Sequence, residues 1–289
     1  MDYIKVLSNK CRIVSTTVPR PSAQVTEGFT LRFVFGGSDL CTVGRRQLYI
    51  QNDSFIVLNK GVPFTSNFGS LIPECVFAIE FGEEFLNDFY LSHAFDDNLL
   101  INAHGELAVI LPELAETIYP FRMEIKHAVS KLKEYLDNGG HDEQQLNEYL
   151  SRCLSSYYRI YNEEILNKAS NLNFLHYSTR VEILRRLNLA KEYLYANYNR
   201  NVNLDGLADH ACLSVNHLLR TFKLAYDQSP HQFLIQLRLQ RAQLLLTKTE
   251  YPIYEIVNMV GFKCTSSFIR LFRTRYKTTP LKYRNVLAA

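Results

Sequence analysis

Hydrophobic positions in the N-terminal part of the chain follow a period of two. Between residues 29 and 81, the runs FTLRFVF, QLYI, SFIVLN and VFAIEF are separated by the glycine pair 36–37 and by a Gly-Val-Pro break at 61–63. Short β-branched and aromatic runs punctuated by turn residues are typical of strands in an antiparallel barrel or sandwich. The pattern therefore predicts a small antiparallel β-domain.

After about residue 85 the period lengthens to about three and a half, which predicts a helical hairpin over residues 118–136 and 144–166. The turn between its helices is the Asn-Gly-Gly break at 138–140. The apolar stripes comprise Ile118, Phe121, Ile125, Val129, Leu132 and Leu136, then Leu146, Leu150, Cys153, Tyr157 and Tyr161. A second face carries Tyr149, Leu154 and Tyr158. The hairpin either covers the barrel or meets a second copy of itself, and the wide stripes favour a homodimer.

The least periodic stretch lies at residues 167–177, where three Asn residues and a Ser precede a new helix near Ser178. We predict a domain boundary there, with an N-terminal domain over residues 1–170 and a C-terminal domain over residues 178–289. The expected fold class is α+β, with an antiparallel β-barrel and helical hairpin followed by an all-α domain.

An internal repeat dominates the C-terminal domain. The segments LLRTFK at 218–223 and PHQF at 230–233 recur 50 residues later as FIRLFR at 268–273 and PLKY at 280–283. Upstream, Leu204, Leu207 and Ala211 recur 49 residues later as apolar positions 253, 256 and 260. The difference of one residue predicts a single insertion in the second copy's turn.

Each copy of the repeat reads as two short helices joined by a tight turn. In the first copy, residues 212–213 form the turn and Ser214 is placed to cap a helix through Lys223. In the second, Gly261 suits a helix end, and Cys264 or Thr265 opens the next helix. Such helix-turn-helix units place their second helix in the DNA major groove.

The helix expected over residues 231–248 is apolar on two sides, so it fixes one unit relative to the other. Recognition helices that enter successive major grooves must lie about 34 Å apart on one face of the duplex. The rigidity of this connecting helix is therefore expected to be part of the binding mechanism.

The small formal charge of +3 conceals an uneven distribution. Residues 1–177 carry a formal charge of −7, whereas residues 178–289 carry +10. Such asymmetry between halves suggests that the basic part meets a polyanion.

Neither a metal centre nor a redox dithiol is indicated by the sequence. The six cysteines form no C-x-x-C pair, and the first histidines, His93 and His104, follow the predicted strands. We therefore expect no cofactor, no metal and no enzymatic activity. Without a long apolar run or a signal-peptide pattern, we also expect a cytoplasmic protein without membrane contact.

Residues 178–289 resemble the double helix-turn-helix domain of the AraC/XylS transcriptional regulators. The resemblance is carried by SVNHLLRTFK at 214–223, SPHQFLIQLRLQRAQLLL at 229–246, IYEIVNMVGFKCTSSFIRLFR at 253–273 and TTPLKYR at 278–284. It implies sequence-specific binding of double-stranded DNA. The N-terminal domain resembles, more weakly, the family's cupin-like effector-binding and dimerisation domain through the strand pattern and VLNKGVPF at 57–64.

The resemblance, with the helical periodicity, assigns candidate DNA contacts. Long or polar side chains on the free faces of the recognition helices are candidates for base contacts, and the remaining cations for phosphate contacts. The base candidates are Asn216, His217, Arg220, Thr265, Ser266, Ser267 and Arg270. The phosphate candidates are Lys223, Arg238, Lys263, Arg273, Arg275 and Lys277. Leu219 would offer only an apolar contact to a thymine methyl group.

The leading interpretation is a transcriptional activator that contacts RNA polymerase and is controlled by a small-molecule effector in the barrel. Residues expected to line that barrel are Phe33, Phe35, Leu48, Ile50 and Phe55, which either surround a ligand or fill the interior themselves. One alternative is an effector-independent regulator whose N-terminal domain serves dimerisation or a protein partner. Another is an enzyme fused to a DNA-binding domain, which the missing barrel histidines disfavour.

Overall fold

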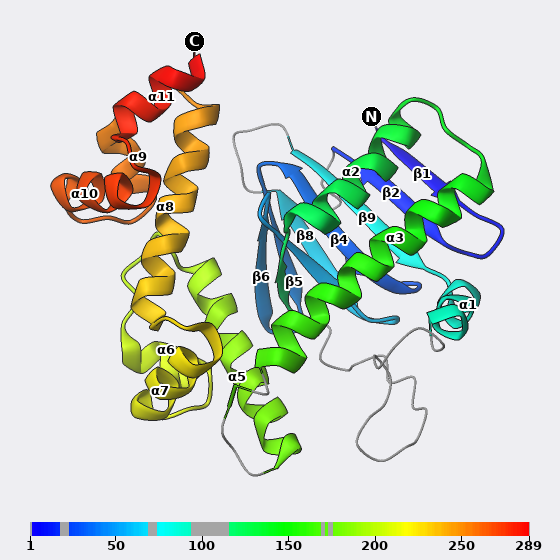
Figure 1. The fold of residues 1–289 in the computed structure, drawn as a ribbon, viewed down its shortest axis with the longest axis horizontal. Helices are drawn as coiled ribbons and strands as arrows, with labels where there is room; N and C mark the ends of the chain where they lie inside the picture. The colour runs from blue at the N-terminus through cyan, green and yellow to red at the C-terminus, as the bar shows by residue number, and fades with distance from the viewer. Residues whose placement is uncertain are drawn as a thin grey trace. The chain divides into compact units, whose positions relative to one another are not determined.

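The computed structural model describes residues 2–17, 23–68, 74–93, 116–168, 171–172 and 176–288. The chain folds into two compact units, Met1–Asn167 and Lys168–Ala289. The first is built on β-strands and the second is helical (Figure 1). Among the described residues, no helix is long and apolar enough to cross a membrane.

The N-terminal unit contains two antiparallel sheets. In spatial order, the six-stranded sheet comprises β1 (Tyr3–Val6), β2 (Arg12–Thr16), β9 (Glu74–Phe81), β4 (Phe29–Gly36), β7 (Ser54–Leu58) and β10 (Ile118–Pro120). The four-stranded sheet comprises β3 (Gln24–Val25), β8 (Pro63–Phe68), β5 (Ser38–Val43) and β6 (Arg46–Gln51). The predicted antiparallel β-domain is confirmed, although the described strands form two sheets and do not close into one continuous barrel.

Strand β4 is covered on both faces, and its two faces differ in character. On one face, the Phe33 ring lies 5.0 Å from that of Phe121, and the Phe29 ring lies 5.5 Å from that of Tyr157, centroid to centroid. On the other face, Thr30 and Arg32 line a cavity. Successive side chains on a strand point to opposite faces, so β4 serves two different interiors.

The prediction that Phe33, Phe35 and Phe55 line the interior of the barrel is wrong. The rings of Phe33, Phe35 and Phe55 all approach Phe121, which lies just before the helical hairpin. They therefore pack between the six-stranded sheet and the helices. Leu48 and Ile50, on β6, are fully buried. The alternation along β4 predicts that Phe33 and Phe35 share one face, but it does not predict which layer that face meets.

The predicted helical hairpin consists of α2 (Met123–Asp137) and α3 (Glu143–Tyr161), and it lies across one face of the six-stranded sheet (Figure 1). The chain continues into a π-helical turn, η1 (Asn162–Asn167). Ile118, expected in the first helix, instead pairs with Ile56 of β7. Pro120 explains the later start, since proline disfavours a helical conformation in the preceding residue and cannot donate a backbone hydrogen bond.

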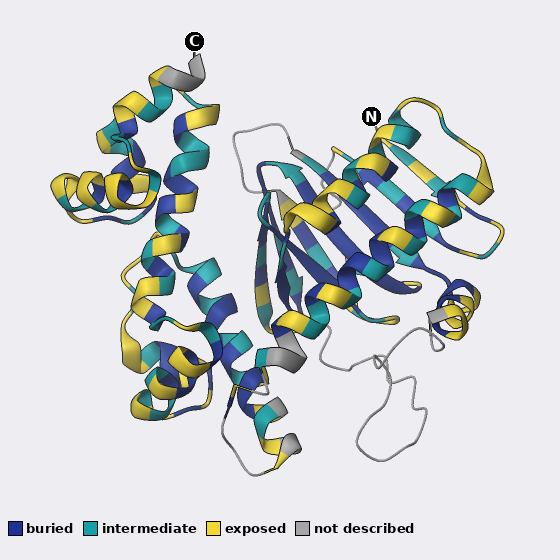
Figure 2. Ribbon diagram, viewed as in Figure 1, coloured by how far each residue is buried: buried dark blue, intermediate teal, exposed yellow. Residues whose placement is uncertain are grey.

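The second apolar face of the hairpin is used within the same unit. Tyr149 packs against Tyr135, Leu154 is fully buried, and Tyr158 packs against Phe89 of α1 (Glu83–His93). Exposed positions run along the solvent side of the hairpin (Figure 2). Charged side chains of the hairpin form ion pairs such as that of Lys131 with Glu134. A homodimer through this hairpin stays a prediction, and it would have to form across a charged surface.

The C-terminal unit is entirely helical in its described residues. Its helices are α5 (Tyr177–Ala196), α6 (Leu204–His210), α7 (Val215–Tyr226), α8 (Pro230–Lys248), α9 (Ile253–Met259), α10 (Thr265–Tyr276) and α11 (Pro280–Ala288). Helices α6 and α7 form the first helix-turn-helix, and α9 and α10 form the second. The connecting helix α8 contributes Leu239, Ala242 and Leu246 to the core of the second pair.

The sequence repeat is matched in the backbone conformation. Cys212 and Gly261 occupy equivalent turn positions with φ of 52° and 83°, and Asp227 and Lys277 occupy equivalent helix ends with φ of 56° and 61°. The helices on either side of the turn end and begin at equivalent positions in the two copies, and the turn of the second copy is one residue longer. The extra residue is Lys263. The left-handed backbone of the turn is therefore required in both copies, although only the second supplies glycine.

A pair of substitutions at the equivalent turn positions tests this requirement. A Cβ atom on Gly261 would lie 2.8 Å from the backbone of Asn199 in a left-handed conformation. Gly261→Ala should therefore lower the free energy of unfolding by about 2–3 kcal/mol. Cys212→Gly, which relieves a left-handed non-glycine residue, should change it by less than about 1 kcal/mol. Urea unfolding followed by helical ellipticity measures both, and equal destabilisation would contradict the backbone account.

Candidate nucleic-acid interface

The first recognition helix, α7, begins at a side-chain cap and presents one polar face. The Ser214 hydroxyl accepts a hydrogen bond from the His217 backbone N–H, as the sequence predicts for a helix cap. The opposite face buries Leu218 and Phe222, and the helix ends at Tyr226, three residues beyond the expected end. Asn216, Arg220 and Lys223 are exposed on one face, at spacings of four and three residues.

His217 is the base-contact candidate of α7 that the structure places differently. Its side chain is only partly exposed, and its backbone carbonyl accepts a hydrogen bond from the Thr221 hydroxyl at 2.7 Å. It therefore lies at the margin of the face formed by Asn216 and Arg220.

The second recognition helix, α10, repeats the arrangement. Phe268 and Phe272 are fully buried. Ser266, Arg270 and Arg273 are exposed at the positions equivalent to Asn216, Arg220 and Lys223 in α7. The remaining base candidates differ in exposure, since Thr265 is exposed and Ser267 is partly buried. Both helices thus carry an arginine in the middle of the free face and a second cation one turn further on.

Two features near α10 were not singled out as contact candidates from the sequence. Ile269 is 37% exposed at the position equivalent to Leu219, and the repeat displacement alone would have identified it. Cys264 occupies the N-cap position. Hydrogen bonds from Ser266 and Ser267 lower the pKa of its exposed thiol to about 6. The Ser266 hydroxyl lies 3.0 Å from its sulfur, so it is already engaged locally.

Five of the six phosphate candidates are exposed, and the sixth has a different environment. Lys223, Lys263, Arg273, Arg275 and Lys277 all lie at the surface of the recognition helices and their ends. Arg238 of α8 instead donates hydrogen bonds to the carbonyl oxygens of Tyr198 and Arg200, at 2.7 and 2.8 Å. Burial lowers the pKa of its guanidinium. The structure therefore separates Arg238 from the other cations and gives it a packing contact.

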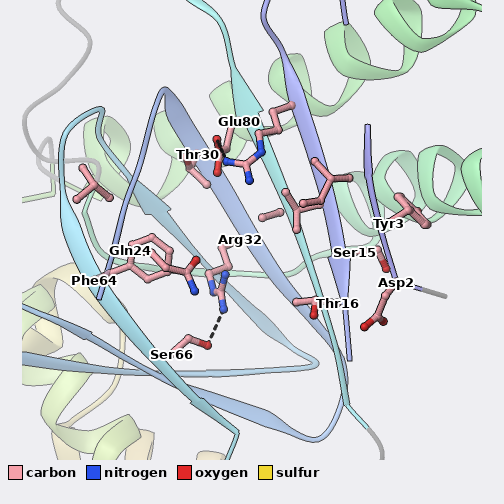
Figure 3. A pocket seen from close by; sticks show the side chains of 15 residues that line it. Asp2, Tyr3, Ser15, Thr16, Gln24, Thr30, Arg32, Phe64, Ser66 and Glu80 are labelled. Atoms are coloured by element: carbon pink, nitrogen blue, oxygen red, sulfur yellow. Dashed lines mark hydrogen bonds and ion pairs between the residues drawn. The ribbon is translucent and has the colours of Figure 1, made fainter. Parts of the chain in front are cut away.

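The N-terminal unit contains a polar cavity of about 410 Å³ between its two sheets (Figure 3). Arg32 projects into it and donates hydrogen bonds from Nε to Asp39 and from Nη2 to Ser66, at 2.9 and 2.7 Å. The Ser66 hydroxyl in turn donates to Asp39 at 2.7 Å. No described residue accepts a hydrogen bond from the remaining nitrogen, Nη1, which leaves its N–H groups available to a ligand.

The rest of the cavity lining mixes charged, hydroxyl and apolar side chains. Arg12 forms an ion pair with Glu80 at 3.4 Å, and burial raises the pKa of that carboxyl despite the arginine. Phe64 lies under the Arg32 guanidinium at 5.3 Å from its ring centroid. The other lining residues are Asp2, Tyr3, Ile4, Val14, Ser15, Thr16, Gln24, Val25, Thr30 and Ala78. The cavity therefore differs in character from the aromatic lining expected from the sequence.

Within the part of the chain that the structure describes, no group of three or more His, Cys, Asp or Glu side chains is arranged to hold a metal ion. Of the two histidines considered from the sequence, His93 ends α1 and His104 lies outside the described residues.

Comparison with known proteins matches residues 207–285 to a protein family described as a helix-turn-helix domain. The chain is similar to the raffinose operon transcriptional regulatory protein RafR of Pediococcus pentosaceus, with 31% identity over 36% of this chain and 38% of that protein. It is also similar to the transcriptional activator RhaS of Escherichia coli, with 27% identity over 61% of each chain. The chain thus spans less than two thirds of the length of these curated relatives.

A solved structure that the chain resembles is the AraC-type DNA-binding-domain regulator from Chromobacterium violaceum. The two share 29% identity over 36% of this chain and 92% of that chain, with a TM-score of 0.34.

Proposed function

The chain belongs to the AraC/XylS family of transcriptional regulators, and from that premise we propose that it binds specific sites in double-stranded DNA and regulates transcription from them. The observation that carries this proposal is the repeated exposed face on α7 and α10. Two helices 50 residues apart in sequence present an arginine and a second cation at equivalent positions on a unit of strongly positive charge.

The chemistry of the two faces supports base recognition by both helices. Arginine pairs with guanine and asparagine with adenine through two hydrogen bonds, each pair contributing about 1–3 kcal/mol of discrimination. We assign these roles to Arg220, Arg270 and Asn216. Ser266 and Thr265 have short side chains, so they contribute contacts of limited reach. Leu219 and Ile269 place aliphatic groups beside the two arginines, where they fit thymine methyl groups.

The N-terminal unit is proposed to bind a small polar effector in the cavity between its sheets. Its volume of about 410 Å³ is within the range of small-molecule sites. The ionised side chains of the lining, Arg12 and Arg32 against Asp2 and Glu80, balance one another. A charged ligand would lose hydration without a net attraction, so a neutral metabolite rich in hydroxyl groups fits best.

The direction of regulation follows by analogy with one relative. RhaS is described as a transcriptional activator, and we extend activation, with a contact to RNA polymerase, to this chain. The effector would act by binding more tightly to the DNA-competent arrangement of the protein than to the incompetent one.

The central arginines provide the test of DNA binding. Arg220→Ala and Arg270→Ala should each weaken binding to the cognate site by about 5- to 150-fold, because each removes one base pairing worth about 1–3 kcal/mol. Both residues are exposed, so the melting temperature should stay near that of the wild type. Lys248→Ala, which removes an exposed cation from the end of α8, is the control. Affinity for a site recovered from genomic DNA that is unchanged in both arginine variants would refute the assignment.

Filling the cavity tests effector binding. Ala78 is buried and lines the cavity, so Ala78→Leu should occupy it while preserving the fold. In thermal-shift measurements with a panel of neutral sugars and polyols, at least one compound should raise the melting temperature of the wild type and not of this variant. Thr65→Leu, on β8 but outside the cavity lining, should retain the response. A panel without any stabilising compound would favour the effector-independent alternative.

A further inference from the structure

The two helix-turn-helix units differ sharply in charge although their backbones match. Residues 203–228 of the first unit carry a formal charge of −1, and residues 252–278 of the second carry +4. In the first unit, Asp205, Asp209 and Asp227 oppose Arg220 and Lys223. In the second, Glu255 alone opposes five cations, Lys263, Arg270, Arg273, Arg275 and Lys277. All five cations are exposed, so the difference is a property of the surface.

The charge difference is concentrated at the ends of the recognition helices. At the N-terminal end, the second unit has the inserted Lys263 directly before the cap of α10, whereas the turn before α7 has no cation. At the C-terminal end, the same left-handed cap position is Lys277 in the second unit and Asp227 in the first. The second recognition helix therefore has exposed cations at both ends, and the first has only Lys223 near one end.

The placement of these cations matters because the two ends of a helix in the major groove approach the phosphates of opposite strands. Helix α10 has 12 residues and is about 18 Å long, which exceeds the groove width of about 12 Å. Cations at both ends can therefore reach both strands while Arg270 occupies the groove. The carboxylate of Asp227, in contrast, would repel the strand at the equivalent end of α7.

We propose a division of work between the two units on DNA. The second unit mainly contacts the phosphate backbone, and the first unit mainly discriminates between base sequences. This inference rests on the proposed DNA-binding function. Phosphate contacts provide affinity for any sequence and carry the dependence on salt, whereas base contacts separate one sequence from another. Substitutions in the two units should therefore have different signatures.

The two units should differ in how strongly they make DNA binding depend on salt. Each phosphate contact contributes about −0.9 to the slope of log affinity against log salt concentration. Four cations of the second unit, apart from Arg270, are available for such contacts, and only Lys223 in the first. Neutralising the four should reduce the slope by about 3 to 4, and Lys223→Gln by about 1 at most.

A reciprocal exchange at the two helix ends is the test, because both residue types already occupy this backbone conformation. The DNA affinities of the full-length Lys277→Asp and Asp227→Lys variants are measured by fluorescence anisotropy over a series of KCl concentrations. The two duplexes are the site recovered from genomic DNA, called the selected site, and a scrambled sequence. Lys277→Asp should weaken binding to both duplexes by a similar factor and reduce the salt slope by at least about 1. Asp227→Lys should strengthen binding to both duplexes. Asn216→Ala should weaken binding to the selected site only.

The proposal is overturned if Lys277→Asp leaves the scrambled duplex and the salt slope unchanged, or if Asn216→Ala weakens both duplexes equally. Lys263→Gln with Arg275→Gln, both at exposed positions, provides a second reduction of charge should Lys277→Asp lower the melting temperature. If the proposed sequence-specific DNA binding itself were wrong, the result would differ, because the wild type would then bind the selected and scrambled duplexes equally. If the wild type discriminates between the two duplexes but Lys277→Asp weakens binding to the selected duplex alone, only the division of work is contradicted.

Discussion

The DNA-binding half depends on one constraint, the burial of α8 on two sides. Near its beginning, the Phe233 ring packs 5.8 Å from the Phe222 ring of the first recognition helix. Further along, Leu239, Ala242 and Leu246 enter the core with α9 and α10. A capping box of Ser229 and Gln232 fixes the start of the helix. Because α8 has 19 residues, it is about 28 Å long.

Arg238 reinforces that constraint from the middle of α8. Its hydrogen bonds to the carbonyl groups of Tyr198 and Arg200 join the helix to the segment that follows α5. A charged donor to a carbonyl contributes more than a neutral one, and leaving such carbonyls without a donor would be costly. The cation expected to touch phosphate from the sequence thus has a structural contact that supports the spacing of the two recognition helices.

In the N-terminal unit, strand β4 joins two interiors of opposite character. Its odd-numbered aromatic residues stabilise the contact with the helical hairpin, and its even-numbered residues present Thr30 and Arg32 to the cavity. The buried pair of Arg32 and Asp39 is a weak source of stability, because desolvation offsets its attraction. Its hydrogen bonds, together with those of Ser66, instead hold the Arg32 side chain in place in the cavity lining. A polar site is thereby held inside an otherwise apolar sandwich.

The sequence predicted the structure best where a residue type has a local structural role, such as a helix cap or a turn. The repeat predicted the two helix-turn-helix units, Ser214 predicted a cap, and Gly261 predicted a left-handed helix end, all of which the structure contains. The prediction failed where the conformation or contacts of a residue depend on partners far away in the sequence. The direction in which the Phe33 side chain points depends on its contact with Phe121. The strand conformation of Ile118 depends on its pairing with Ile56. Arg238 likewise depends on carbonyls about 40 residues away.

The central claim is that α8 holds two recognition helices for successive major grooves of one duplex. Hydroxyl-radical footprinting of the wild type on a selected site tests it most directly, because the method resolves each protected backbone position. Two protected regions about 10 base pairs apart on one face of the duplex are expected. Arg220→Ala should weaken one region and Arg270→Ala the other. A single protected region, or two on opposite faces of the duplex, would contradict it.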